Sequence, residues 1–144
     1  DPWELNPHPS VVVGGNMKFL YLMKDPLGSA DCKIGITGIT RAMDRLGVYQ
    51  NSYSARSHYA TFNHLWYGKS NPISKLESVL KDTFGYAIML EGRGYSEWIA
   101  EPEDVILNKI AETIEDYHFH VYKIGQDINV HNINDVINRL TNEG

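Results

Sequence analysis

The chain has 144 residues, of which 42% are hydrophobic and 22% are charged, a composition typical of a single globular domain. No run of 18 uncharged apolar residues occurs, so the sequence predicts no membrane-spanning helix. Cys32 is the only cysteine, which excludes an internal disulfide and favours a reducing compartment. We therefore expect a cytoplasmic protein.

The formal net charge of -5 argues against a protein that coats nucleic acid or an anionic membrane, because phosphate contacts need lysine and arginine. The charge is unevenly distributed along the chain. Residues 33–81 hold seven lysines and arginines against two acidic residues, a net charge of +5. Residues 100–144 hold three against nine, a net charge of -6. The cationic stretch suits either a focused phosphate site or an ordinary solvated surface.

The N-terminal part of the chain predicts a β-hairpin followed by a helix. Residues 1–16 hold three prolines and a Gly-Gly pair, which is typical of an irregular arm. Two apolar runs, 17–23 and 32–37, are separated by a loop rich in turn residues, and this pattern predicts an antiparallel hairpin. Thr40 is a suitable N-cap for a helix over residues 41–50.

The rest of the chain alternates between predicted strands and helices. Residues 58–67 alternate in polarity like a strand, and Asn71 followed by Pro72 predicts the start of a helix. The expected buried stripe of that helix consists of Ile73, Leu76, Leu80 and Phe84. Further strands are expected over 86–90, 95–99 and 117–124, and further helices after Pro102 and over 133–140.

This order of elements predicts an α+β domain with a small, largely antiparallel sheet. We expect the domain to cover residues 17–100 and the acidic residues 101–144 to form an α/β extension packed on it. The sequence contains no phosphate-binding glycine-rich loop with a lysine, no cysteine pair for zinc and no HExxH motif.

Five residues spread over four predicted elements form the most informative arrangement. Tyr21 lies on the first strand of the hairpin, Lys33 and Gly35 lie on the second, and Arg45 and Glu77 lie on the two helices that follow. Glu77 falls on or beside an apolar stripe, where a lone carboxylate is costly unless it is paired or bound to a metal. The alternative reading of Glu77 is an ordinary ion pair with Lys81 at i,i+4.

The order of these residues resembles the GIY-YIG nuclease family. The first motif stands as Phe19-Leu20-Tyr21 and the second as Lys33-Ile34-Gly35, followed by "RAMDRLGVYQ", "ISKLESVLKDTF" and "GYSEW". These segments are most similar to the branch of the family found in phage and large-virus proteins, in which a lysine often replaces the tyrosine of the second motif. The resemblance covers roughly residues 17–99.

The resemblance implies a three-stranded antiparallel sheet flanked by helices and a divalent-metal-dependent endonuclease acting on DNA. Tyr21 would activate the attacking water, Lys33 would replace the second tyrosine, and Arg45 would be the catalytic arginine. Glu77 would be the one carboxylate ligand of Mg²⁺ or Mn²⁺. If the gene belongs to a phage or virus, the expected location is the host cytoplasm.

The chemistry of these side chains agrees with such a reaction. Arg45 offers a planar guanidinium that matches two phosphate oxygens. Mg²⁺ keeps most of its waters and often takes only one or two protein carboxylates, so Glu77 alone could hold it. Lys33 close to Tyr21 would favour the phenolate form of the tyrosine.

Further residues are expected to contact the substrate. Gly35 would allow backbone and phosphate to approach closely, and Arg41 competes with Arg45 for the arginine role. The substrate contacts that we predict are Gly35, Arg41, Tyr49, His58 and Lys69. The family often has an additional histidine or tyrosine after the arginine helix, and the candidates are Tyr49, His58, Tyr59 and His64.

Two other functions stay open at this point. The missing second tyrosine and the overall acidity suit a non-catalytic nucleic-acid-binding or protein-interaction module with the same fold. The chain could also be a structural domain of a larger viral or mobile-element protein, or a homo-oligomer. His118 and His120 could ligate a metal from one face of a strand, although such residues are commonly ordinary strand positions.

Overall fold

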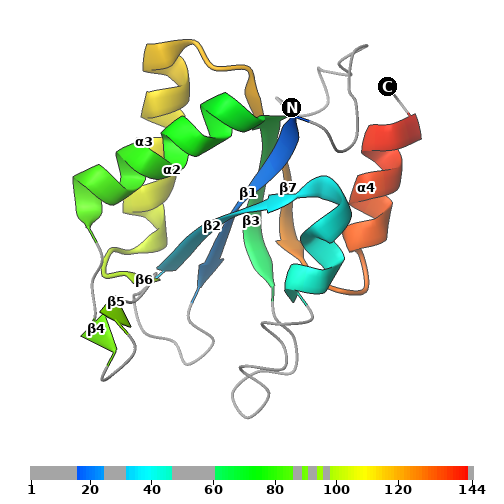
Figure 1. Ribbon diagram of the computed structural model, residues 1–144, viewed down its shortest axis with the longest axis horizontal. Coiled ribbons are helices and arrows are strands. Elements are labelled where there is room, and N and C mark those ends of the chain that lie inside the picture. The colour runs from blue at the N-terminus through cyan, green and yellow to red at the C-terminus, as the bar shows by residue number, and fades with distance from the viewer. Residues whose placement is uncertain are drawn as a thin grey trace.

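The computed structural model describes residues 16–24, 32–46, 61–85, 89–90, 94–95 and 98–142. Within these residues the centre of the fold is an antiparallel sheet with the strand order β6-β2-β1-β3-β7 (Figure 1). Its four long strands are β1 (Met17–Lys24), β2 (Cys32–Gly38), β3 (Phe62–Lys69) and β7 (Val121–Ile128). The short strand β6 (Trp98–Ile99) pairs with the first two residues of β2.

Helices cover both faces of this sheet, as Figure 1 shows. One face is covered by α2 (Ser70–Phe84) and α3 (Glu103–Tyr117), and we call it the α2/α3 face. The other, the α4 face, is covered by α4 and by a turn that follows β2. Helix α4 spans Ile133–Asn142, and the turn consists of the 3-10 helix η1 (Ile39–Arg41) and the helical residues 42–46.

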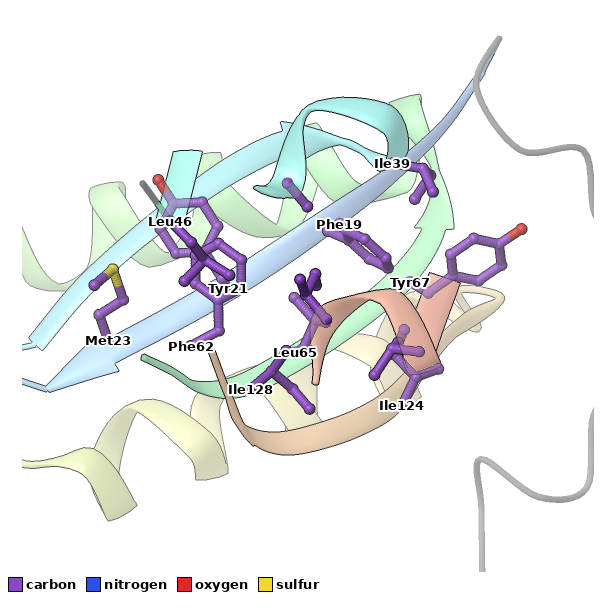
Figure 2. Close-up of a cluster of buried hydrophobic side chains, with 13 residues drawn as sticks. Phe19, Tyr21, Met23, Ile39, Leu46, Phe62, Leu65, Tyr67, Ile124 and Ile128 are labelled. Carbon is purple, nitrogen blue, oxygen red and sulfur yellow. The ribbon is translucent and has the colours of Figure 1, made fainter. Parts of the chain in front are cut away.

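The strand residues alternate between two hydrophobic clusters, because successive side chains of a strand point to opposite faces. On β1, Leu20 and Leu22 pack with Ile73, Leu76 and Ile106 of the helices on the α2/α3 face. Figure 2 shows the cluster on the α4 face, which contains Phe19, Tyr21, Leu65, Ile124 and Ile128. The α+β class and the antiparallel β1–β2 hairpin are therefore confirmed.

The sheet is larger than the three strands that the resemblance implies. The acidic extension contributes β7, which pairs with β3, and β6 is added at the opposite side. Strand β7 also begins four residues later than expected. The α3 helix continues through Tyr117 and ends at His118, whose left-handed backbone (φ 55°) lets the Phe119 amide donate to the Ile114 carbonyl. His118 is therefore the cap residue of a helix, and neither His118 nor His120 lies on a strand.

Both predicted N-caps, Thr40 and Asn71, are wrong, because in each case a strand runs directly into the following helix. Strand β3 runs directly into α2, so Lys69 is the residue before the helix and it makes no side-chain cap bond. The Ser70 amide donates instead to the Asn16 carbonyl at 2.5 Å, a tertiary contact that removes the need for a cap by Asn71. Thr40 likewise lies inside η1, which begins after Gly38.

The apolar stripes of the helices follow the predicted periodicity. In α2 the side chains of Ile73, Leu76 and Leu80 are buried and Phe84 packs against them. In α3 the side chains of Ile106 and Ile110 are buried. A small separate hairpin pairs β4 (Met89–Leu90) with β5 (Gly94–Tyr95). No helix in the described segments is long and apolar enough to cross a membrane.

Candidate active site

Tyr21, Lys33 and Gly35 lie on the same face of neighbouring strands. The register places Tyr21 directly opposite Gly35, and Met23 opposite Lys33. Directly opposite residues share a face, so all of these residues belong to the α4 face. Tyr21 and Lys33 are diagonal neighbours across the hairpin, which corresponds to roughly 7–8 Å between their strand positions. The two motifs that we expected to act together are thus adjacent.

The Tyr21 ring is held between an aromatic ring and a glycine. It stacks on Phe62 with ring centroids 4.5 Å apart and an angle of 23° between the planes. On its other side the ring crosses Gly35 so closely that a β-carbon there would overlap the Tyr21 hydroxyl and ring carbons. Figure 2 shows the hydroxyl at the β2 side of the cluster. The glycine of the KIG motif is therefore required by the packing of Tyr21.

Lys33 is an unusually buried lysine, with 7% of its surface exposed. Its strand neighbours are Met23 on β1 and Trp98 on β6. Tyr21 is only 2% exposed. A substrate could therefore reach these two side chains only at the sheet edge or after a local rearrangement.

Arg45 and Arg41 follow β2 on the same side of the sheet. Ile39, Ala42 and Leu46 of this turn are buried in the cluster that contains Tyr21. Arg41 and Arg45 themselves are exposed. The apolar residues of the turn thus anchor it on the α4 face while the two guanidinium groups remain available to solvent.

Glu77 lies in a different layer. It belongs to α2, which covers the α2/α3 face, whereas Tyr21 and Lys33 are on the α4 face. The Glu77 side chain is 23% exposed and its Oε1 lies 3.4 Å from Lys81 Nζ. This is the i,i+4 ion pair that the sequence offered as the alternative to a metal ligand. The structure does not bring Glu77 onto the face of the other three residues.

The remaining predicted contacts are divided between described and undescribed parts of the chain. Lys69 is exposed at the end of β3, opposite Met17 in the β1–β3 register. Tyr49, Tyr59 and His58 lie outside the described residues. The domain boundary proposed at residue 100 falls between β6 and α3, and both parts contribute strands to the one sheet.

Metal binding would rest on very few groups. Among the described residues no group of three or more histidine, cysteine, aspartate or glutamate side chains could hold a metal ion. Glu77 could still supply one oxygen ligand to a hydrated Mg²⁺ or Mn²⁺, since such ions keep several waters. The ion would then compete with the Lys81 ammonium for the carboxylate.

Sequence reasoning missed a polar cluster at the other end of the sheet. His64 Nε2 lies 3.0 Å from Glu103 Oε2, and Lys24 Nζ lies 3.9 Å from the same oxygen. Burial lowers the pKa of His64 below its ordinary value of 6.5, against the opposing effect of the Glu103 hydrogen bond. Its Nδ1 is buried and has no hydrogen-bond partner within the described part of the chain. His64 and Glu103 are 39 residues apart, so no local pattern links them.

Comparisons with known proteins return no match. No family model matches the chain, and no curated protein and no solved structure matches it at a significant level. The function is therefore inferred from the motifs and from the geometry of the described residues.

Proposed function

We propose that this protein is a divalent-metal-dependent endonuclease that hydrolyses phosphodiester bonds in DNA. The observation that carries the proposal is the pairing of the two motifs. Tyr21 stands directly opposite Gly35 and its ring occupies the space that a side chain at Gly35 would need. This contact gives the FLY and KIG motifs a shared structural role, which supports one site built from both.

Each side chain has a distinct task in the proposed reaction. Hydrolysis of a phosphodiester needs an activated water and a group that stabilises the charge on the phosphate oxygens. Tyr21 would activate the water, with the Lys33 ammonium favouring its phenolate form. Arg45 would bind two phosphate oxygens through its guanidinium. When bound at Glu77, Mg²⁺ or Mn²⁺ supplies a hard cation that offsets the charge of the leaving oxygen.

The opposite placement of Tyr21 and Glu77 restricts where the phosphate can lie. Side chains on two faces of a sheet can act on one phosphate only around a free edge of that sheet. Within the described residues β2 pairs with β6 only through Cys32 and Lys33, which leaves its edge from Ile34 to Gly38 without a neighbouring strand. The Tyr21 ring crosses Gly35 in this stretch. The proposal therefore puts the scissile phosphate at the β2 edge.

A matched pair of variants tests this function. Glu77→Gln removes the proposed metal ligand, and Glu112→Gln makes the same change at another helical glutamate that pairs with a lysine, Lys109. With supercoiled plasmid or branched DNA and Mg²⁺ or Mn²⁺, Glu77→Gln is expected to reduce cleavage at least about 100-fold. Glu112→Gln is expected to cut like the wild type. Equal cleavage by the wild type and both variants would refute the role of Glu77 as the metal ligand.

A non-catalytic nucleic-acid-binding module is the second candidate. It is favoured by the burial of Tyr21 and Lys33 and by the ion pair between Glu77 and Lys81. In that case loss of Arg45 weakens DNA binding, and no metal-dependent cleavage accompanies the binding. Nicking above the Glu77→Gln background excludes this candidate.

A further inference from the structure

The two ends of the sheet differ in how their cations are neutralised. At the end where β1 finishes, Lys24 and His64 share the Glu103 carboxylate. At the end where β1 begins, Lys18 stands opposite Gly38 on β2 and Gly68 on β3, and Lys69 stands opposite Met17. Arg41 follows three residues after Gly38 in η1. We call Lys18, Arg41 and Lys69 the basic end.

The basic end has no counter-charges among the described residues. Neither an ion pair nor a carboxylate hydrogen bond involves Lys18, Arg41 or Lys69 in this part of the chain. Asp44 lies one helical turn from Arg41 and forms no ion pair with it, and the first turn of α2 contributes no acidic residue. In contrast, Lys24, Lys81 and Lys109 each have a glutamate within 4 Å.

Lys18 is placed so that an anion can reach it. Its ammonium lies 3.7 Å from the position that a β-carbon on Gly38 would occupy, so the neighbouring strand carries no side chain that shields it. Lys18 is half-buried, whereas Arg41 and Lys69 are exposed. Lys18 belongs to the α2/α3 face, whereas Lys69 and the η1 turn with Arg41 belong to the α4 face. The three cations, which have no ion-pair partner among the described residues, therefore surround this end of the sheet from both faces and create a positive field that attracts a polyanion.

We infer that the basic end binds the phosphate backbone of duplex DNA. The choice of DNA over another polyanion rests on the proposed function. The inference adds a second surface that contacts the duplex outside the β2 edge, where the scissile phosphate is proposed to lie. Contacts of lysine and arginine with phosphates carry no sequence information, so this surface contributes affinity and register. Sequence or structure preference would come from other contacts.

The experiment compares two double variants that remove the same charge. Lys18→Gln with Lys69→Gln removes two cations of the basic end, and Lys24→Gln with Lys109→Gln removes two cations that are paired with glutamates. Binding of a fluorescently labelled DNA duplex is measured by anisotropy over a series of salt concentrations in EDTA, so that metal-dependent cleavage cannot contribute. Thermal unfolding of each variant checks that it is folded.

We expect the slope of log affinity against log salt to become shallower by about two for the basic-end variant, about one for each lost phosphate contact. Its affinity at low salt is expected to fall on the order of tenfold, while the control keeps the wild-type slope. Equal slopes for the two variants, or a wild type without salt-dependent binding, would overturn the inference. Cleavage by the wild type is measured in a separate assay. If the wild type binds DNA with the expected salt dependence but does not cut it, the proposed endonuclease activity is refuted and the inferred DNA binding by the basic end still stands.

Discussion

The contact between Tyr21 and Gly35 is the smallest feature on which the proposed site depends. A side chain at Gly35 would meet the Tyr21 hydroxyl and ring, and Phe62 on the other side blocks the ring from moving away. The interior of a protein is close-packed, so such an overlap must be relieved by moving several side chains.

Substitution of this glycine gives a direct test of the packing. Gly35→Ala is expected to lower the free energy of unfolding by about 1–3 kcal/mol, the usual cost of overpacking. The control is Gly38→Ala on the same strand. There the added β-carbon would meet only the Lys18 ammonium at 3.7 Å, and the backbone (φ -67°, ψ 154°) suits any residue. Urea denaturation of the two variants measures the difference, and equal stabilities would contradict the packing argument.

Tyr67 is a second residue whose hydroxyl has consequences for stability. It is 1% exposed, and its hydroxyl has no hydrogen-bond partner among the residues that the structure describes. Burial raises the pKa of Tyr67 from 10.0 to about 12, because the phenolate would lose its hydration. An unpaired buried hydroxyl costs more than an apolar group of similar shape.

Removal of this hydroxyl is expected to stabilise the protein. Tyr67→Phe should raise the free energy of unfolding by about 1 kcal/mol at neutral pH. Because the pKa is higher in the folded protein, the wild type loses stability as pH rises from about 10 through 12, and the variant should lose less. Denaturation at pH 8 and pH 11 measures both effects, with the exposed Tyr117→Phe as the control. A variant that is less stable at both pH values would refute this account.

Among the elements, His64 joins the interior strand β3 to the first turn of α3. Its ring contacts Glu103 on one side and lies 6.1 Å from the Trp66 ring on the other. Lys123, whose ammonium lies 5.9 Å from the Trp66 ring, and Asp127 act on the histidine from β7. Lys24 reaches the same Glu103 carboxylate from β1. Four elements therefore meet at this histidine.

The lowered pKa of His64 predicts a dependence of stability on pH. The unfolded chain binds a proton at His64 near pH 6.5, whereas the folded protein does so only at lower pH, so stability is lost as pH falls below about 6.5. His64→Gln should show a smaller decrease between pH 7 and pH 5 than the wild type. The exposed His131→Gln serves as the control. Identical pH profiles for wild type and His64→Gln would remove His64 as the cause.

The edge strand β7 shows how the elements protect the rim of the sheet. A register shift between Leu65 and Trp66 leaves Ile124 as an extra residue on β7. Its carbonyl accepts a hydrogen bond from Arg139 of α4 at 3.1 Å. Such a bulge bends an edge strand and disfavours pairing with another chain.

At the scale of the whole molecule, the net charge of -5 is the sum of unlike surfaces. Two acidic residues of α3, Glu103 and Asp104, lie in its first turn and offset the helix dipole, and Glu103 also neutralises Lys24. Lys18, Arg41 and Lys69, which have no such partner among the described residues, lie around the end of the sheet where β1 begins. A negative total charge is therefore compatible with a local phosphate-binding surface, because a polyanion responds to the field near it.

The local features of the fold could be predicted because they depend on short-range patterns. Apolar spacing identified the buried stripes of α2, through Ile73, Leu76 and Leu80, and turn residues separated β1 from β2. The N-caps were missed because the helix start at Ser70 is satisfied by Asn16, 54 residues earlier in the chain. Among the candidate site residues, hairpin pairing was enough to bring Tyr21 next to Lys33 and Gly35.

The amphipathic elements and the placement of both motifs on one hairpin follow from the sequence alone, since alternation and turn chemistry act over a few residues. The tertiary structure alone decided that β7 of the acidic extension pairs with β3 and that α2 crosses to the face opposite Tyr21. It also decided that Glu103 meets His64 and that Lys18 and Lys69 share an end of the sheet. These contacts join residues far apart in the chain. They form because the sheet must bury both of its hydrophobic faces at once.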